Sequence, residues 1–219
     1  MTRINYEHEL SILNKDIRQM GQMVETSIEQ CFIAFEDQDY EKAENIIRGD
    51  RDINDLERAI ESRCLSLILR QQPVAGDLRV VSGALKVVTD LERIGDHASD
   101  IAELILRIRG EHVYHVVRHI PGMAMAAREM VRNSIEAFIN QDSETARAIE
   151  KQDDIVDELF AKVKNDVIDL LRQPDGHADQ CIDLLMIAKY LERIADHAVN
   201  VCEWTEFAKT GVLKNVRIL

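Results

Sequence analysis

The sequence predicts an all-α protein built from two tandem, pseudo-symmetric three-helix bundles, with six long antiparallel helices in total. Three observations lead to this fold class. Helix breakers are scarce, with 3 Pro and 9 Gly among 219 residues. Apolar residues recur with helical spacing along most of the chain. Residues 90–104 and 190–204 share eight identities in fifteen positions at a constant offset of 100, which indicates a duplicated unit of about half the chain.

The first half of the chain predicts three helices, and their ends are marked by polar residues and proline. We expect these helices at 5–36, at 40–71, and from the loop at 73–79 to about 109. Asp39 suits an N-cap, because its carboxylate can accept hydrogen bonds from free amides at a helix start. Pro73 ends the second helix, and Asp77 is the candidate cap of the third.

The second half repeats this pattern. We expect helices at 121–140, 143–172 and 178–208, followed by a short tail. Pro121 suits the first turn of a helix, and Asn140-Gln-Asp142 repeats the polar break of Asp37-Gln-Asp39. The organisation that follows is a first repeat at 1–110 and a second at 111–219.

The residues that repeat by identity are mostly charged, and this points to a functional site. Duplicated cores keep apolarity rather than identity, whereas here Leu-Glu-Arg-Ile and Asp-His-Ala recur intact. On a helix, residues four apart share a face. The third and sixth helices should therefore each carry a stripe of polar oxygen donors, formed by Glu92, Asp96 and Asp100 and by Glu192, Asp196 and Asn200.

The polar face of the second helix in each repeat should lie beside these stripes. Asp50, Asn54, Glu57 and Glu61 share one face of the helix at 40–71, and Asp153 and Asp157 occupy the positions equivalent to Asp50 and Asn54. Packing in a three-helix bundle brings Asp50 towards Glu92 and Asp96. It likewise brings Asp153 and Asp157 towards Glu192 and Asp196.

Carboxylates crowded on consecutive turns repel each other and need positive charge nearby. A metal ion is one source, because carboxylates from two helices can bridge hard or borderline cations. Ion pairing is the other. Arg93 is three residues from Asp96, Arg193 three from Asp196, and Lys189 three from Glu192. The spacing alone leaves both alternatives open.

Composition excludes several function classes. The formal charge of −13 disfavours binding to nucleic acid or anionic lipid. The N-terminal residues have no apolar signal-peptide region, and no window approaches 18 uninterrupted apolar residues. The four cysteines are widely spaced and lie in apolar-periodic stretches, so we expect buried free thiols in a reducing cytoplasm.

The histidines give no support to an enzyme. Di-metal helical-bundle oxidases use Glu-x-x-His, and none of the seven histidines has Glu three residues before it. No nucleophile elbow or phosphate-binding glycine loop is present either. We expect His97 and His197 to hydrogen-bond locally. His112, His115 and His119 would share a face if helical, and form either a metal-binding face or an exposed connector.

With these motifs in place, the chain resembles the PhoU family of phosphate-uptake regulators over its whole length. The resemblance is carried by three segments, residues 73–79, 91–97 and 191–197. It implies a cytoplasmic, non-enzymatic negative regulator of phosphate uptake and of the phosphate-starvation response. Such a protein acts as an adaptor between a phosphate ABC transporter, with its ATPase subunit, and a sensor histidine kinase. A flat pseudo-symmetric bundle would also pair readily as a homodimer.

The resemblance also implies iron or zinc, held in polynuclear sites by paired E/DxxxD motifs on the bundle surface. These motifs match Glu92 to Asp96 and Glu192 to Asp196, and more loosely Asp153 to Asp157. The pair from Asp50 to Asn54 departs from the motif. The alternative function is a carboxylate-bridged metal-binding bundle with a redox or metal-storage role.

Overall fold

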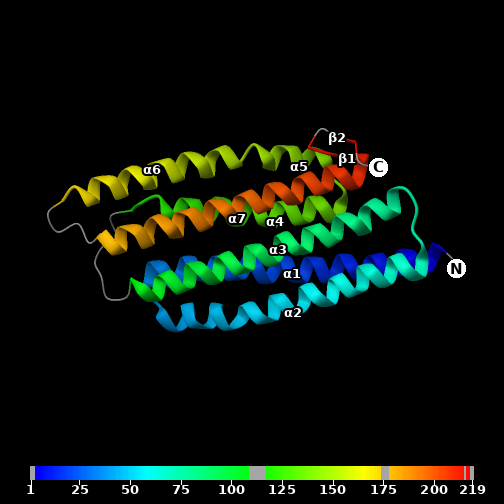
Figure 1. Cartoon of the computed structure of the whole chain (residues 1–219), viewed down its shortest axis with the longest axis horizontal. Coiled ribbons are helices and arrows are strands. Elements are labelled where there is room, and N and C mark those ends of the chain that lie inside the picture. Colours follow the sequence, from blue (N-terminus) through cyan, green and yellow to red (C-terminus); the bar gives the residue numbers. More distant parts are fainter. Residues whose placement is uncertain (1–2, 109–116, 174–177, 215, 218–219) are drawn as a thin grey trace.

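The computed structural model describes residues 3–108, 117–173, 178–214 and 216–217, and it confirms the all-α architecture (Figure 1). The elements in chain order are α1 (Arg3–Asp37), α2 (Tyr40–Gln71), α3 (Gly76–Arg107), α4 (Ile120–Asn140), α5 (Ser143–Glu150), α6 (Asp153–Leu171), α7 (Ala178–Thr210), β1 (Val212–Leu213) and β2 (Val216–Arg217).

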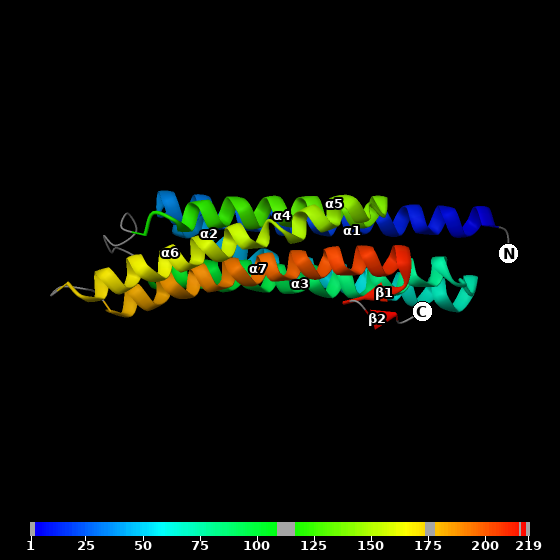
Figure 2. The same ribbon diagram turned by 90° about the horizontal axis from the view of Figure 1, so that it is seen from above.

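Two bundles lie side by side along the long axis of the molecule (Figures 1 and 2). The first consists of α1, α2 and α3, and the second of α4, α5, α6 and α7. They are joined by α3 packing antiparallel along α7 and by α1 packing along α4. As a result, α2 and α6 lie on the outer flanks, each beside one of the two helices that carry the repeated acidic motif.

The hydrophobic core runs through both repeats as one cluster, because each helix turns an apolar stripe inwards. Large side chains with essentially no exposed surface come from both halves of the chain, including Leu13, Met20, Leu91, Ile105, Met130, Ile149 and Leu184. The two repeats therefore share a core, which fixes how their polar faces are oriented relative to one another.

The flank formed by α1 and α4 is joined by ion pairs as well as by close packing. Arg18 donates two hydrogen bonds to Glu136, of 2.7 and 3.0 Å. In a second ion pair, Arg128 of α4 lies 3.1 Å from Glu25 of α1. At Gly21 a Cβ atom would lie only 2.6 Å from the Ile135 side chain, so the absence of a side chain allows the two helices to approach.

The cap predicted at Asp39 is confirmed, and so is the proline at the start of α4. Asp39 accepts a hydrogen bond of 3.0 Å from the backbone amide of Lys42. Asp142 does the same at the start of α5, accepting from Glu144 and Thr145 at 3.1 Å each. Both side chains satisfy amides that have no partner within the helix.

The continuous helix predicted at 143–172 is wrong in one respect, because a turn at Lys151–Gln152 divides it into α5 and α6. Hydrogen bonds from Gln152 to Ile149 and from Ile155 to Gln152, of 2.8 and 3.0 Å, take the place of the usual helical bonds there. The division suits the sequence that follows it. Asp153 and its neighbour fall in the first turn of α6, where the helix dipole favours negative charge.

The cap predicted for the third helix is also wrong. α3 already begins at Gly76, and Asp77 lies inside its first turn. The N-cap is Ala75, which has a φ of 48° and makes no side-chain capping bond. The tight turn after Pro73 reverses the chain before Asp77, so this carboxylate is too late to cap the helix.

The short tail predicted after the last helix contains a hairpin that the sequence did not predict. After α7 the chain turns at Gly211, whose φ is 79°, and β1 pairs with β2 as a short antiparallel hairpin. Lys214 at the hairpin turn forms an ion pair of 3.2 Å with Glu203 of α7, which ties the hairpin to the end of the second bundle.

Three further expectations can be compared with the described residues. All four cysteines are free and buried, as predicted. His112 and His115 lie outside the described residues. His119 stands at the N-cap of α4, with its Nε2 atom 3.8 Å from Asp166 of α6. In the described parts of the chain, every helix is too short or too polar to cross a membrane.

The shared core makes a clear prediction about stability. Replacing Leu91, which is fully buried in α3, with alanine should lower the free energy of unfolding by about 2–5 kcal/mol. Leu69 is the matched control, because its side chain is 78% exposed and L69A should change the value by less than about 0.5 kcal/mol. Urea unfolding followed by circular dichroism measures both. Equal losses in the two variants would contradict the assigned core.

Candidate metal centres

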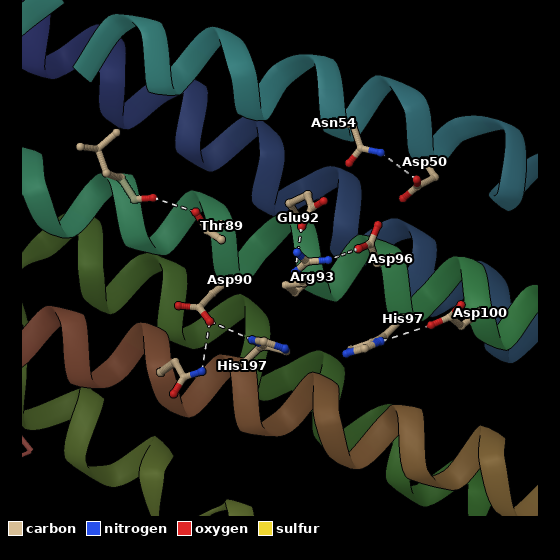
Figure 3. A network of polar contacts seen from close by, with 12 residues as sticks. Asp50, Asn54, Thr89, Asp90, Glu92, Arg93, Asp96, His97, Asp100 and His197 are labelled. Carbon is tan, nitrogen blue, oxygen red and sulfur yellow. Dashed lines mark hydrogen bonds and ion pairs between the residues drawn. The ribbon is translucent and has the colours of Figure 1, made fainter. Parts of the chain in front are cut away.

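The N-terminal acidic cluster lies between α2 and α3, as the sequence predicted (Figure 3). Asp50 and Asn54 of α2 face Glu92 and Asp96 of α3, and the Asn54 amide donates a hydrogen bond of 3.0 Å to Asp50. The second oxygen of Asp50 and the side-chain oxygen of Asn54 are buried, and neither has a hydrogen-bond partner among the described residues. Buried oxygens without a partner are unfavourable unless a ligand satisfies them.

Gly95 brings the two helices of this cluster close together. A Cβ atom at this position would lie 3.2 Å from Ile53 and 3.4 Å from an oxygen of Asp50. The glycine thus seats Asp50 directly against α3. At the equivalent position of the second repeat stands Ala195, which is fully buried. Sequence reasoning missed this role, although position 95 is the one difference within the repeated Leu-Glu-Arg-Ile-x-Asp-His-Ala segment.

In the N-terminal cluster, the ionised form of the carboxylates is less favourable than it is for the same groups in water. Burial raises the pKa of Asp50, and the negative charge of Asp96 adds to the rise. Burial also raises the pKa of Glu92, again with a contribution from Asp96. Glu57 of α2 experiences the same negative charge, because burial and the charge of Glu92 raise its pKa. A cation placed among these groups would relieve their repulsion.

Arg93 already supplies part of that positive charge. Its guanidinium lies 2.9 Å from an oxygen of Asp96 and 3.4 Å from an oxygen of Glu92. The ion pair predicted between Arg93 and Asp96 is therefore confirmed. Asp100 lies at the edge of the cluster, where it pairs with Nδ1 of His97 at 3.4 Å and its charge contributes to the raised pKa of Asp50.

The C-terminal cluster has four carboxylates, Asp153 and Asp157 of α6 and Glu192 and Asp196 of α7. Burial raises the pKa of Asp153 to about 6, and the charges of Asp157 and Asp196 add to the rise. Burial and the charge of Glu192 likewise raise the pKa of Asp196. One oxygen of Asp153 is buried and has no hydrogen-bond partner in the described part of the chain.

The positive charge in the C-terminal cluster comes from Lys189. Its ammonium group forms an ion pair with Glu192, as the spacing predicted. The same ammonium lies 5.5 Å from the centre of the Phe160 ring on α6. The predicted pair between Arg193 and Asp196 is absent from the described residues. Burial lowers the pKa of the His97 imidazole, and the positive charge of the nearby Arg193 makes a smaller contribution in the same direction.

Asn200 and His197 belong to a different group of contacts, at the interface between the two repeats, where Figure 3 shows His197 beside Asp90. His197 Nδ1 lies 2.8 Å from Asp90 of α3, and the Asn200 amide donates to the same oxygen of Asp90 at 3.1 Å. Asn200 is therefore turned towards α3. The local hydrogen bond expected for His197 is wrong, because its partner is in the other repeat.

The two repeated histidines have different partners, because the residues opposite them on the other repeat are not the same. His97 faces Tyr190, with 5.4 Å between ring centres, and His197 faces Asp90. Residues 90 and 190 are equivalent at the offset of 100. Sequence reasoning missed Asp90 because the contact joins helices more than 100 residues apart. The sequence did offer one signal for this contact, since the equivalent positions 90 and 190 hold aspartate and tyrosine although the histidines are repeated.

The two clusters fit a bound metal chemically, although their donors do not converge on a single point. Among the described residues, no three carboxylate, histidine or cysteine side chains are gathered closely enough to hold an ion as they stand. The available donors are carboxylate oxygens from two adjacent helices, which suit hard or borderline cations. Each cluster also contains an aspartate oxygen that lacks a partner, on Asp50 and on Asp153, so the residues present can accept such an ion.

Comparison with known proteins places the chain in a family. The PhoU domain matches residues 17–105 and 120–205, once in each repeat. The chain belongs to the PhoU family. It is 39% identical over 212 residues to a protein of Clostridium acetobutylicum named "Phosphate-specific transport system accessory protein PhoU homolog", covering 96% of this chain and 97% of the relative. A relative from Thermotoga maritima with the same name, numbered 1, is 30% identical and covers 98% of this chain and 92% of its own.

Solved structures agree with this assignment. The crystal structure of the phosphate transport system regulatory protein PhoU from Streptococcus pneumoniae superposes with a TM-score of 0.89 at 28% identity, over 96% of this chain and all of that one. PhoU from Pseudomonas aeruginosa gives 0.86 at 29% identity, over 94% of this chain and all of its own. The tandem PhoU architecture is confirmed, and the family consists of regulatory proteins of phosphate transport rather than enzymes.

The raised pKa of Asp153 makes stability depend on pH. The unfolded carboxyl ionises near its ordinary value of 3.8, whereas the folded one ionises near 6. The unfolded state therefore loses its proton first, and stability from this group falls as pH rises from about 4 to 6. D153N should remove this fall. At pH 7, without metal, the variant should be more stable by on the order of 1 kcal/mol, discounted because the carboxylate is partly solvated.

Urea unfolding at pH 4 and pH 7, in the presence of a chelator, measures the difference. E158Q is the matched control, since Glu158 is an exposed carboxylate on the same helix. A D153N variant that is less stable than the wild type at pH 7 would show that Asp153 is held by attraction rather than crowded by repulsion.

Proposed function

We propose that this chain is a cytoplasmic negative regulator of phosphate uptake and of the phosphate-starvation response. It acts as an adaptor between a phosphate ABC transporter, through the ATPase subunit, and a sensor histidine kinase. The observation that carries the proposal is the match along 96% of the chain to a relative named as an accessory protein of phosphate-specific transport. The acidic surface, with a net charge of −13, supports partners with basic protein surfaces rather than nucleic acid.

We also propose how the molecule is organised for this role. The functional repeats are residues 1–110 and 111–219, and the protein works as a homodimer. The pseudo-symmetric, elongated double bundle supports this arrangement, because it offers long flat faces for pairing and for docking (Figures 1 and 2).

The deletion phenotype tests the regulatory role. Removing the gene in its own organism should raise expression of the phosphate-uptake genes in phosphate-rich medium, because the repressing adaptor is lost. Transcript levels of the transporter genes measure this effect, and the wild-type gene supplied in trans should restore them. Unchanged transcripts in a strain without a second PhoU protein would contradict the proposal.

The acidic clusters are the proposed metal sites, with iron or zinc as the ion. Asp50, Glu92, Asp96 and Asp100 serve the N-terminal site, and Asp153, Asp157, Glu192 and Asp196 serve the C-terminal one. The donor role predicted for Asn200 is wrong, because its side chain bonds to Asp90 of α3. A bound metal would neutralise the carboxylates and present a positive centre to an oxyanion such as phosphate. The C-terminal cluster should bind more firmly, since Asp157 supplies a carboxylate where Asn54 supplies an amide. The unpartnered oxygen of Asp153 supports the same site.

Replacing Glu192 and Asp196 together with alanine should lower the bound metal by about half or more, because the firmer of the two sites is lost. Helix content should remain nearly unchanged, since both side chains lie on the polar face of α7. The measurement is elemental analysis of tag-free protein purified without chelator. The control is E129A/E158A, which removes two carboxylates of the same repeat that lie outside the cluster. Unfolding of the double variant with no change in metal content would mean that the carboxylates belong to a structural ion-pair network.

A further inference from the structure

The two acidic clusters differ at two positions whose residues are in contact in the second repeat. Position 89 is threonine and the equivalent position 189 is lysine, at the offset of 100. Position 57 is glutamate and the equivalent position 160 is phenylalanine, at the offset of 103 that relates α2 to α6. A hydroxyl and a carboxylate in the first repeat are thus replaced by an ammonium group and an aromatic ring in the second.

These two replacements are in contact with each other in the second repeat. The Lys189 ammonium lies 5.5 Å from the centre of the Phe160 ring, within the range of a cation–π interaction. It also forms the ion pair with Glu192. In the first repeat the Thr89 hydroxyl donates to the carbonyl oxygen of Leu85 in its own helix and leaves Glu92 untouched.

The exposures of the paired groups differ in a useful way. The Glu192 side chain is 15% exposed, whereas the Lys189 side chain is 41% exposed. The Glu192 carboxylate is therefore largely enclosed by the protein. The Lys189 side chain approaches it from solvent and has room to turn away. The Phe160 ring is already within cation–π range, and it would continue to stabilise the ammonium when the lysine is displaced from the carboxylate.

We propose that Lys189 is a tethered counter-ion that competes with a metal ion for Glu192 and so sets the metal affinity of the C-terminal cluster. The inference rests on the metal sites proposed above. An ammonium group and a metal cation on the same carboxylate repel each other, so each weakens the binding of the other. Metal uptake therefore displaces Lys189 towards Phe160 and solvent, and metal loss lets it return to neutralise Glu192.

Arg93 does not reproduce this arrangement in the first repeat. Its guanidinium is shared between Glu92 and Asp96, at 3.4 and 2.9 Å, and its side chain is 55% exposed. Glu57 stands where Phe160 stands in the second repeat, so this position offers a carboxylate in place of an aromatic ring. The two clusters are accordingly tuned differently, and the lysine acts only on the C-terminal one.

The experiment uses the full chain with E92A and D96A introduced, so that only the C-terminal cluster binds. Apo protein is titrated with Zn²⁺ by isothermal calorimetry, after circular dichroism has verified the helix content. K189M should bind Zn²⁺ about fivefold more tightly than its parent, because a partly exposed ion pair contributes about that factor. K189T, which removes the charge with a smaller side chain, provides a second neutral variant.

Two controls isolate the charge on Lys189. K189R keeps the positive charge and should bind like the parent. K164M removes an equal charge from an exposed lysine on α6 and should also bind like the parent. Equal or weaker binding by both K189M and K189T would overturn the inference, and so would tightening by K189R. Those results would leave the metal site standing, whereas absence of Zn²⁺ binding in every variant, the unsubstituted chain included, would overturn the metal proposal and this inference with it.

Discussion

The antiparallel packing of α3 against α7 is the constraint on which the rest of the structure depends. Each helix buries an apolar stripe in the shared core, including Leu91 in α3 and Leu191 in α7. When that stripe is buried, the repeated carboxylates lie on the opposite side of each helix and point outwards, towards α2 from α3 and towards α6 from α7. The acidic clusters beside α2 and α6 are thus a consequence of how the core closes, and their separation is set by the same packing.

The clusters show how a folded protein tolerates crowded carboxylates through its own side chains. Burial and mutual repulsion raise the pKa of Asp50 and of Asp153. Internal cations offset part of this repulsion, Arg93 in one cluster and Lys189 in the other. An added cation would relieve the repulsion that remains. This is the physical basis of the metal sites proposed above.

The two repeats are equivalent in fold and inequivalent in chemistry. Gly95 lets α2 approach α3 closely, whereas Ala195 occupies the corresponding place in the second repeat. The repeated histidines meet different partners, Tyr190 for one and Asp90 for the other. If both clusters bind metal as proposed, such differences would let one half respond at a cation concentration that leaves the other half unchanged.

Most of the architecture was determined by the sequence alone, because helical periodicity and a repeat by identity are local patterns. They predicted the all-α class, the tandem repeats, the cap at Asp39, the polar break repeated at Asn140–Asp142, and the pairing of Asp50 and Asp153 with their acidic stripes. The division of α5 from α6 was not predicted, since no proline or glycine marks Lys151–Gln152 and the bonds that form the turn are set by packing.

Only the tertiary structure decided which partners the polar side chains take. It turned Asn200 and His197 towards Asp90, placed Lys189 over Phe160, and brought Ile53 and Asp50 of α2 close to the backbone of α3 at Gly95. These contacts join helices that are distant in the chain. Spacing along one helix specifies a face, but the partner on that face depends on how neighbouring helices cross and on how close their backbones come.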